Sequence, residues 1–144
     1  MSDDLEQLYQ DLILEHYRNP RHAEEISEED ADVEKLNPTC GDRVRLTLTV
    51  CDQKITACVH DSKGCAVARA SASLMASALQ SGTVEEARAK TAAFLRLMET
   101  GDVDADLGDI LALKQVRDFP LRVRCATLPW LAMEEALTNY SHEP

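Results

Sequence analysis

The sequence predicts an α+β fold in which a small antiparallel β-sheet packs against several α-helices. Residues 43–50 alternate between polar and apolar side chains, as a half-buried strand does, whereas most later apolar residues recur at helical spacing. The chain has 144 residues, the size of one ordinary domain, and contains no internal repeat or linker. We therefore expect residues 1–144 to form a single domain.

The first quarter of the chain is predicted to hold one helix and one irregular segment. In residues 4–17, leucines recur at helical spacing, with His16 on the same face. Asn19-Pro20 ends this helix, because the residue before a proline avoids the helical region. Residues 21–36 are rich in acids and are expected to be irregular.

The next segment is predicted to be a β-hairpin with one buried face. Its first strand places alternate apolar side chains on that face: Val44, Leu46, Leu48 and Val50. A turn follows at residues 52–54. Ile55, Ala57 and Val59 then alternate again, which would place Cys58 on the opposite face.

Helical periodicity dominates the rest of the chain. Helices are expected over 66–80, 84–99, 107–116 and 126–140. Thr83 and Glu86 have the spacing of a capping box at the start of the second of these, and Phe119-Pro120 breaks the third. The last helix presents one apolar face, made of Trp130, Met133, Leu137 and Tyr140.

Charge and composition exclude several classes of function. The 26 acids and 15 bases give a net charge of −11, which argues against binding to the phosphates of nucleic acids. No apolar run approaches the roughly 18 residues that cross a membrane. The first residues are acidic and lack the pattern of a secretory signal. We expect a cytoplasmic protein with no membrane partner.

The five cysteines favour metal or thiol chemistry, because an odd number in a reducing compartment does not suit a disulfide framework. Three of them fall at the ends of predicted elements: Cys40 in a turn, Cys65 before a helix and Cys125 at the expected start of the last helix. Side chains at such ends can converge at one rim of the sheet. Asp42 lies two residues after Cys40 and can turn toward the same point.

Three thiolates and one carboxylate suit tetrahedral Zn²⁺. With the metal bound, this donor set would keep a formal charge of about −2, which the neighbouring Lys63, Arg122 and Arg124 could offset. A hard oxygen donor among soft sulfurs is unusual for a purely structural site and suggests a position that can open.

The residue pattern alone leaves another interpretation open, since a single free cysteine is commonly a small buried apolar residue. We expect that role for Cys51 and Cys58. The histidines have no ligand spacing relative to the cysteines, so surface or capping roles are expected for all of them: His16, His22, His60 and His142.

Four segments of the sequence resemble a known family. They are residues 8–21 (LYQDLILEHYRNPR), 37–42 (NPTCGD), 63–66 (KGCA) and 119–128 (FPLRVRCATL). In this order, and over nearly the whole chain, they are similar to the motifs of the IscU/NifU-type iron–sulfur cluster assembly family. The scaffold branch of that family carries histidine before the third cysteine, where this chain has Arg124. This residue and the long segment around residues 95–115 resemble the SufU-type, zinc-dependent sulfurtransferase branch.

The resemblance implies a function and a set of site residues. It implies zinc bound by Cys40, Asp42, Cys65 and Cys125, with Cys40 as the catalytic residue that accepts persulfide sulfur. The donor would be a cysteine desulfurase of the SufS type, and the sulfur would pass to a SufBCD-type scaffold. Ala68 and Arg69 depart from the residues that relatives often carry after the second cysteine, which could change the rim that a partner meets.

Two rival functions share the same site. In the first, the chain is a scaffold on which a [2Fe–2S] cluster is assembled, although Arg124 in place of histidine counts against this. In the second, the chain is a zinc adaptor that activates or positions the desulfurase without carrying sulfur. Metal analysis distinguishes the scaffold, and trapping of sulfur on Cys40 distinguishes the carrier from the adaptor.

Overall fold

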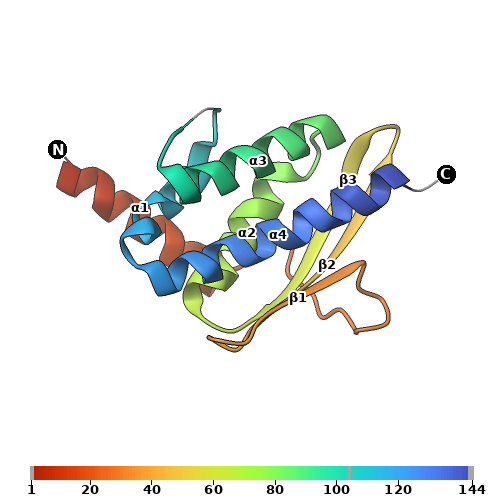
Figure 1. The fold of residues 1–144 in the computed structure, drawn as a ribbon, viewed down its shortest axis with the longest axis horizontal. Helices are drawn as coiled ribbons and strands as arrows, with labels where there is room; N and C mark the ends of the chain where they lie inside the picture. The colour runs from red at the N-terminus through yellow and green to blue at the C-terminus, as the bar shows by residue number, and fades with distance from the viewer. Residues whose placement is uncertain (1, 104, 143–144) are drawn as a thin grey trace.

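The computed structural model describes residues 2–103 and 105–142, and its fold is of the predicted α+β class (Figure 1). The elements, in order, are α1 (Ser2–Arg18), β1 (Val33–Asn37), β2 (Asp42–Cys51), β3 (Lys54–Lys63), α2 (Ala66–Leu79), α3 (Val84–Thr100), the 3₁₀ helix η1 (Gly108–Asp118) and α4 (Pro120–His142). The strands form one antiparallel sheet in the order β1-β2-β3. Strands β2 and β3 confirm the predicted hairpin.

Strand β1 was not predicted, since residues 21–36 were expected to be irregular. It pairs with β2 from Val33 opposite Leu46 to Asn37 opposite Asp42. Only its two end residues, Val33 and Asn37, are buried, and the three between them are charged or exposed. A five-residue edge strand with so few buried side chains has no period-two signal, and its pairing with β2 defines it instead.

A bulge in the hairpin corrects the predicted face of β3. The register shifts between Thr49 and Val50, so Ile55 pairs with Val50 and Cys58 pairs with Leu48. One extra residue moves every later side chain to the other face of a strand. Ile55 and Cys58 are therefore both fully buried, whereas Ala57 and Val59, which the alternation placed on the buried face, are only partly buried.

The helices gather on one side of the sheet, where α2 and α4 lie against it (Figure 1). Phe94 of α3 stacks on Trp130 of α4 with ring centroids 4.6 Å apart, and both rings are fully buried. The predicted capping box at Thr83 and Glu86 is present, and Gly101 ends α3 in the left-handed conformation. These local signals fix the ends of α3.

Helix α4 begins earlier than predicted. The sequence placed its start near residue 126, directly after Cys125, but the helix starts at Pro120. Proline suits the first helical position, because it lacks an N–H that would have no partner there. Cys125 therefore lies inside the helix, in its second turn, whereas Cys65 is the N-cap of α2 as predicted.

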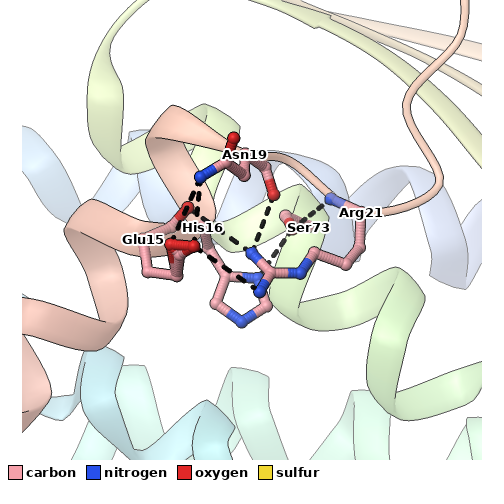
Figure 2. A network of polar contacts seen from close by, with 5 residues as sticks. All are labelled: Glu15, His16, Asn19, Arg21 and Ser73. Atoms are coloured by element: carbon pink, nitrogen blue, oxygen red, sulfur yellow. Dashed lines mark hydrogen bonds and ion pairs between the residues drawn. The ribbon is translucent and has the colours of Figure 1, made fainter.

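A polar network around the buried side chains of His16 and Ser73 joins the end of α1 to α2 (Figure 2). His16 Nδ1 lies 2.7 Å from Ser73 Oγ, which also accepts a hydrogen bond of 2.7 Å from the backbone N–H of Arg21. On the other side of the same segment, His60 Nε2 lies 2.9 Å from the carbonyl oxygen of Arg21. The two imidazoles thus hold the chain between α1 and β1 onto α2 and β3.

These contacts correct the expectation for two histidines. His16 and His60 are buried rather than on the surface, and burial lowers the pKa of both imidazoles. His22 is exposed, as expected. The side chain of His142 lies outside the described residues. The place of His16 on the leucine face of the first helix was a signal of burial, but the partners Ser73 of His16 and Arg21 of His60 are 57 and 39 residues away, beyond the reach of periodicity.

Within residues 2–103 and 105–142, no helix combines the length and the apolar character needed to cross a membrane.

Candidate metal centre

Three junctions of the fold bring the predicted site residues to one end of the sheet. Cys40 and Asp42 lie on the β1–β2 loop and at the start of β2, and Cys65 lies where β3 leads into α2. Cys125 comes from the second turn of α4. Because β1 pairs with β2, and α2 and α4 pack against the sheet, residues separated by up to 85 positions meet here.

The donor atoms of Cys40, Asp42 and Cys125 all lie within 4.8 Å of one another. Cys65 is not part of this group of three, but its Sγ lies 4.0 Å from Asp42 Oδ2. The structure thus brings all four predicted side chains into one cluster, in which Asp42 neighbours the other three. Three sulfurs and one carboxylate at this spacing form a candidate metal site.

Asp42 is the most firmly held of the four. Its side chain is 1% exposed, and its Oδ1 accepts a hydrogen bond of 2.9 Å from the backbone N–H of Cys65. Gly64 makes this approach possible, because a Cβ at that position would lie 2.8 Å from the Cα of Asp42. Gly64 also adopts a φ of +128°, a backbone conformation that residues with a Cβ rarely adopt. The glycine before Cys65 is therefore required by the geometry of the site.

Cys40 lies on the short loop that joins β1 to β2. The carbonyl oxygen of Asn37 accepts hydrogen bonds from the backbone N–H groups of Cys40 and Gly41, at 3.2 and 2.8 Å. Gly41 follows with a φ of +73° and open space around its Cα. Cys40 is partly exposed, whereas Cys125 is fully buried. Of the two, only Cys40 is open to a partner.

The cluster concentrates acidic groups in a confined space. Burial raises the pKa of the Cys125 thiol, and the neighbouring Asp42, Cys65 and Cys40 side chains act in the same direction. Thiolates and a carboxylate this close together would repel one another unless positive charge lies nearby. A divalent cation supplies that charge, so the donor set fits a thiolate-binding metal such as zinc.

One of the predicted basic neighbours faces the cluster. The charge of Cys65, together with a hydrogen bond to Cys125, raises the pKa of the Arg122 guanidinium. The Arg122 guanidinium thus interacts with two of the thiols, and the residue is exposed. Arg124 and Lys63 are also exposed. Ala68 is fully buried and cannot form part of a partner-facing rim, whereas Arg69 lies over the Tyr17 ring, 5.1 Å from its centroid.

The remaining two cysteines lie away from the cluster. Cys51 is exposed at the end of β2, and Cys58 is buried in the core, where desolvation raises its pKa to about 12. A thiol with that pKa is not reactive at neutral pH. The sequence reasoning missed a further buried member of the site, Asn37, whose only sequence signal is its place in the NPTCGD motif.

Fold and site together define a small α+β domain with a cysteine–aspartate cluster at one end of its sheet. Residues 8–144 match the model of the NifU-like N-terminal domain family, and the chain belongs to this family. It is 38% identical over 137 residues to the zinc-dependent sulfurtransferase SufU of Bacillus subtilis (strain 168), covering 94% of this chain and 92% of the relative.

A second relative is the iron–sulfur cluster assembly scaffold protein IscU of Streptococcus pyogenes serotype M1. It is 33% identical over 135 residues, covering 92% of this chain and 84% of the relative. Among solved structures, a nitrogen-fixing NifU-like protein (N-terminal) from Brucella abortus superimposes with a TM-score of 0.80 at 27% identity, covering 97% and 99% of the two chains. The chain is thus a member of an iron–sulfur cluster assembly family.

Proposed function

We propose that this protein is a zinc-dependent sulfurtransferase that accepts sulfur from a cysteine desulfurase on Cys40. The observation that carries the proposal is the cluster itself, in which the donor atoms of Cys40, Asp42 and Cys125 lie within 4.8 Å of one another and Cys65 adjoins Asp42. These four residues would hold the zinc ion. When bound, zinc would keep the thiols deprotonated and offset their charge. The similarity to the B. subtilis SufU supports this choice of metal and activity.

Burial and anchoring distinguish Cys40 from the other two thiols. Cys125 is fully buried within α4, where another protein cannot reach it. Cys65 is the N-cap of α2, and its backbone N–H is bonded to Asp42, so its movement would disturb a helix end. Cys40 lies on a loop and is partly exposed. It is the thiol that can move toward a donor at the lowest cost in packing.

The transfer would need no added oxidant or reductant. The Cys40 thiolate attacks the terminal sulfur of a persulfide on the desulfurase, which forms a new S–S bond on Cys40. The S–S bond on the donor breaks, and its electron pair remains on the donor cysteine as a thiolate. A second exchange of the same kind would pass the sulfur to the next acceptor.

We propose a SufS-type desulfurase as the sulfur donor and a SufBCD-type scaffold as the destination. Exposed apolar side chains on the elements that carry the site support a docking face for such a partner. Leu36 at the end of β1 is 60% exposed, and Phe119 and Leu121, just before and within the first turn of α4, are 62% and 71% exposed. Apolar groups that flank a reactive loop are typical of a protein-binding surface.

The experiment incubates the purified protein with a desulfurase and cysteine, then identifies modified cysteines by mass spectrometry of peptides. We expect one additional sulfur on Cys40 and zinc at about one ion per chain. Cys40→Ser should lose the adduct while remaining folded. Cys51→Ser, which alters an exposed thiol outside the cluster, is the matched control and should behave as the unmodified protein.

Two results would contradict the proposal. An adduct on Cys65 or Cys125 with Cys40 unmodified would reject the assignment of the acceptor. Zinc binding with no sulfur on any cysteine, although the desulfurase is stimulated, would favour the adaptor function instead.

The scaffold function is the second candidate, because the S. pyogenes relative is an assembly scaffold. Its test is the visible spectrum of the protein as purified. A bound [2Fe–2S] cluster is coloured, whereas zinc is not. A brown protein with iron in excess of zinc would favour the scaffold over the sulfurtransferase.

A further inference from the structure

Asn37 is a buried amide at the end of β1 that contacts the cluster without being one of its four donors. Its side chain is 6% exposed, and Nδ2 lies 3.4 Å from Asp42 Oδ2 and 3.9 Å from Cys125 Sγ. Asn37 also pairs with Asp42 across the β1–β2 ladder. Asn37 therefore neighbours two of the proposed metal ligands, Asp42 on the adjacent strand β2 and Cys125 on α4.

The orientation of the amide follows from its surroundings. Both neighbours, a carboxylate and a sulfur, are hydrogen-bond acceptors when ionised. The NH₂ group, whose Nδ2 faces both atoms, can donate to both, whereas the flipped amide would place its own acceptor oxygen against two acceptor atoms. A buried amide adopts the orientation that satisfies its hydrogen bonds. Asn37 therefore donates to Asp42 and Cys125.

The hydrogen bonds around the thiols are unequal. Cys125 Sγ has the Asn37 amide beside it, with Nδ2 at 3.9 Å. Within the described part of the chain, no hydrogen-bond donor from outside the cysteine–aspartate cluster is found at Cys40 Sγ. The backbone carbonyl of Asn37 meanwhile accepts the N–H groups of Cys40 and Gly41, which sets the shape of the loop.

We propose that Asn37 is a positioning residue that holds Asp42 and Cys125 in place at the metal centre. Its N–H groups draw electron density from the Cys125 sulfur and fix Oδ2 of Asp42, the carboxylate oxygen that does not bond to the Cys65 N–H. With those two metal ligands held in place, Cys40 is the ligand that can leave the metal. The last statement rests on the proposed sulfurtransferase function, whereas the first concerns metal binding alone.

The test compares Asn37→Asp with Asn37→Ala. Aspartate has nearly the shape of asparagine and keeps the backbone contacts of the loop, but it replaces the N–H donors with a second negative charge. Alanine removes the side chain. Asn139→Asp is the matched control, because it makes the same change at an exposed position on α4.

Zinc release to a chelator is the first measurement. Loss of an outer hydrogen bond to a metal ligand typically lowers metal affinity by about 10- to 100-fold. We expect zinc release from Asn37→Ala to be faster by about that factor, and release from Asn37→Asp to be faster still. Asn139→Asp should release zinc at the rate of the unmodified protein.

The second measurement is the sulfur-to-metal charge-transfer band of the protein loaded with Co²⁺ in place of zinc. A thiolate that loses an N–H donor becomes more electron-rich, so the band should move to longer wavelength in both Asn37 variants. A residue that acts only through packing would not move it. Thermal unfolding of the metal-free variants, recorded in chelator, separates any loss of fold from loss of metal.

The proposal is overturned if Asn37→Asp releases zinc and absorbs as the unmodified protein does. It is overturned equally if the metal-free variants are destabilised as much as the metal-loaded ones, since Asn37 would then act on the fold. These outcomes are independent of sulfur transfer. If the unmodified protein accepts no sulfur, the proposed function fails while the zinc and cobalt results still decide the role of Asn37.

Discussion

Replacement of Gly64 by alanine should damage both the fold and the metal centre. Gly64 has a φ of +128°, where a residue with a Cβ is strained by about 1–3 kcal/mol. The new Cβ would also lie 2.8 Å from the Asp42 Cα and 2.9 Å from its Cγ, so β2 or the junction with α2 must shift. Neither contact is with the mobile end of a flexible side chain.

That shift would break the hydrogen bond of 2.9 Å from the Cys65 N–H to Asp42 Oδ1. A hydrogen bond to a charged group contributes about 1.5–3 kcal/mol. Strain and the lost bond together predict a loss of about 2.5–6 kcal/mol in the free energy of unfolding. This is a large share of the roughly 5–15 kcal/mol that stabilises an ordinary domain.

Urea unfolding in the presence of a chelator measures the effect on the fold, and metal analysis measures the effect on zinc. Gly108→Ala is the matched control. Gly108 also has a positive φ, of +54°, but a Cβ added there would meet no atom within 4 Å. This substitution should cost only about 1–2 kcal/mol and retain zinc. If Gly64→Ala is no more destabilising than Gly108→Ala and keeps its metal, the reasoning about Asp42 is wrong.

Three further predictions concern other residues. Arg122→Gln should speed zinc release by at most about fivefold, since the guanidinium is exposed, and Arg124→Gln should change it less. Because burial lowers the pKa of His16 and of His60 in the folded state, the unfolded chain binds protons first, and thermal stability in chelator should fall as the pH drops below about 6.5. His16→Gln should weaken that dependence, and the remainder is due to His60. Cys58→Ser should retain zinc but cost about 1–3 kcal/mol in urea unfolding, because a hydroxyl replaces a thiol in the core, whereas Cys51→Ser should change stability by less than about 0.5 kcal/mol. Loss of metal from either cysteine variant would contradict the assignment of the cluster.

The sequence predicted the elements whose signals are local. Helical spacing located α1, α2 and α3, and the capping box with Gly101 defined both ends of α3. Alternation from Val44 onward located the hairpin. The sequence also placed Cys40 and Cys65 correctly at element ends, because a turn motif and a change of period stand beside them. Each of these signals involves residues within a few positions of one another.

What the sequence missed depends on contacts between distant segments. The bulge that buries Cys58 is a property of the pairing between β2 and β3. Strand β1 is defined only by its backbone pairing with β2. Pro120 reads equally as the end of one helix and the first residue of another, so only packing places Cys125 within α4.

The composition of the site and its assembly therefore have different origins. The sequence proposed the four candidate donors, from their places at the ends of predicted elements and from the resemblance to a known family. Only the tertiary structure decided that Asp42 bonds to Cys65, that Arg122 faces the thiols and that Asn37 is buried among them. Those contacts join residues that are from 3 to 88 positions apart, and periodicity within a window of one helix or strand carries no information about most of them.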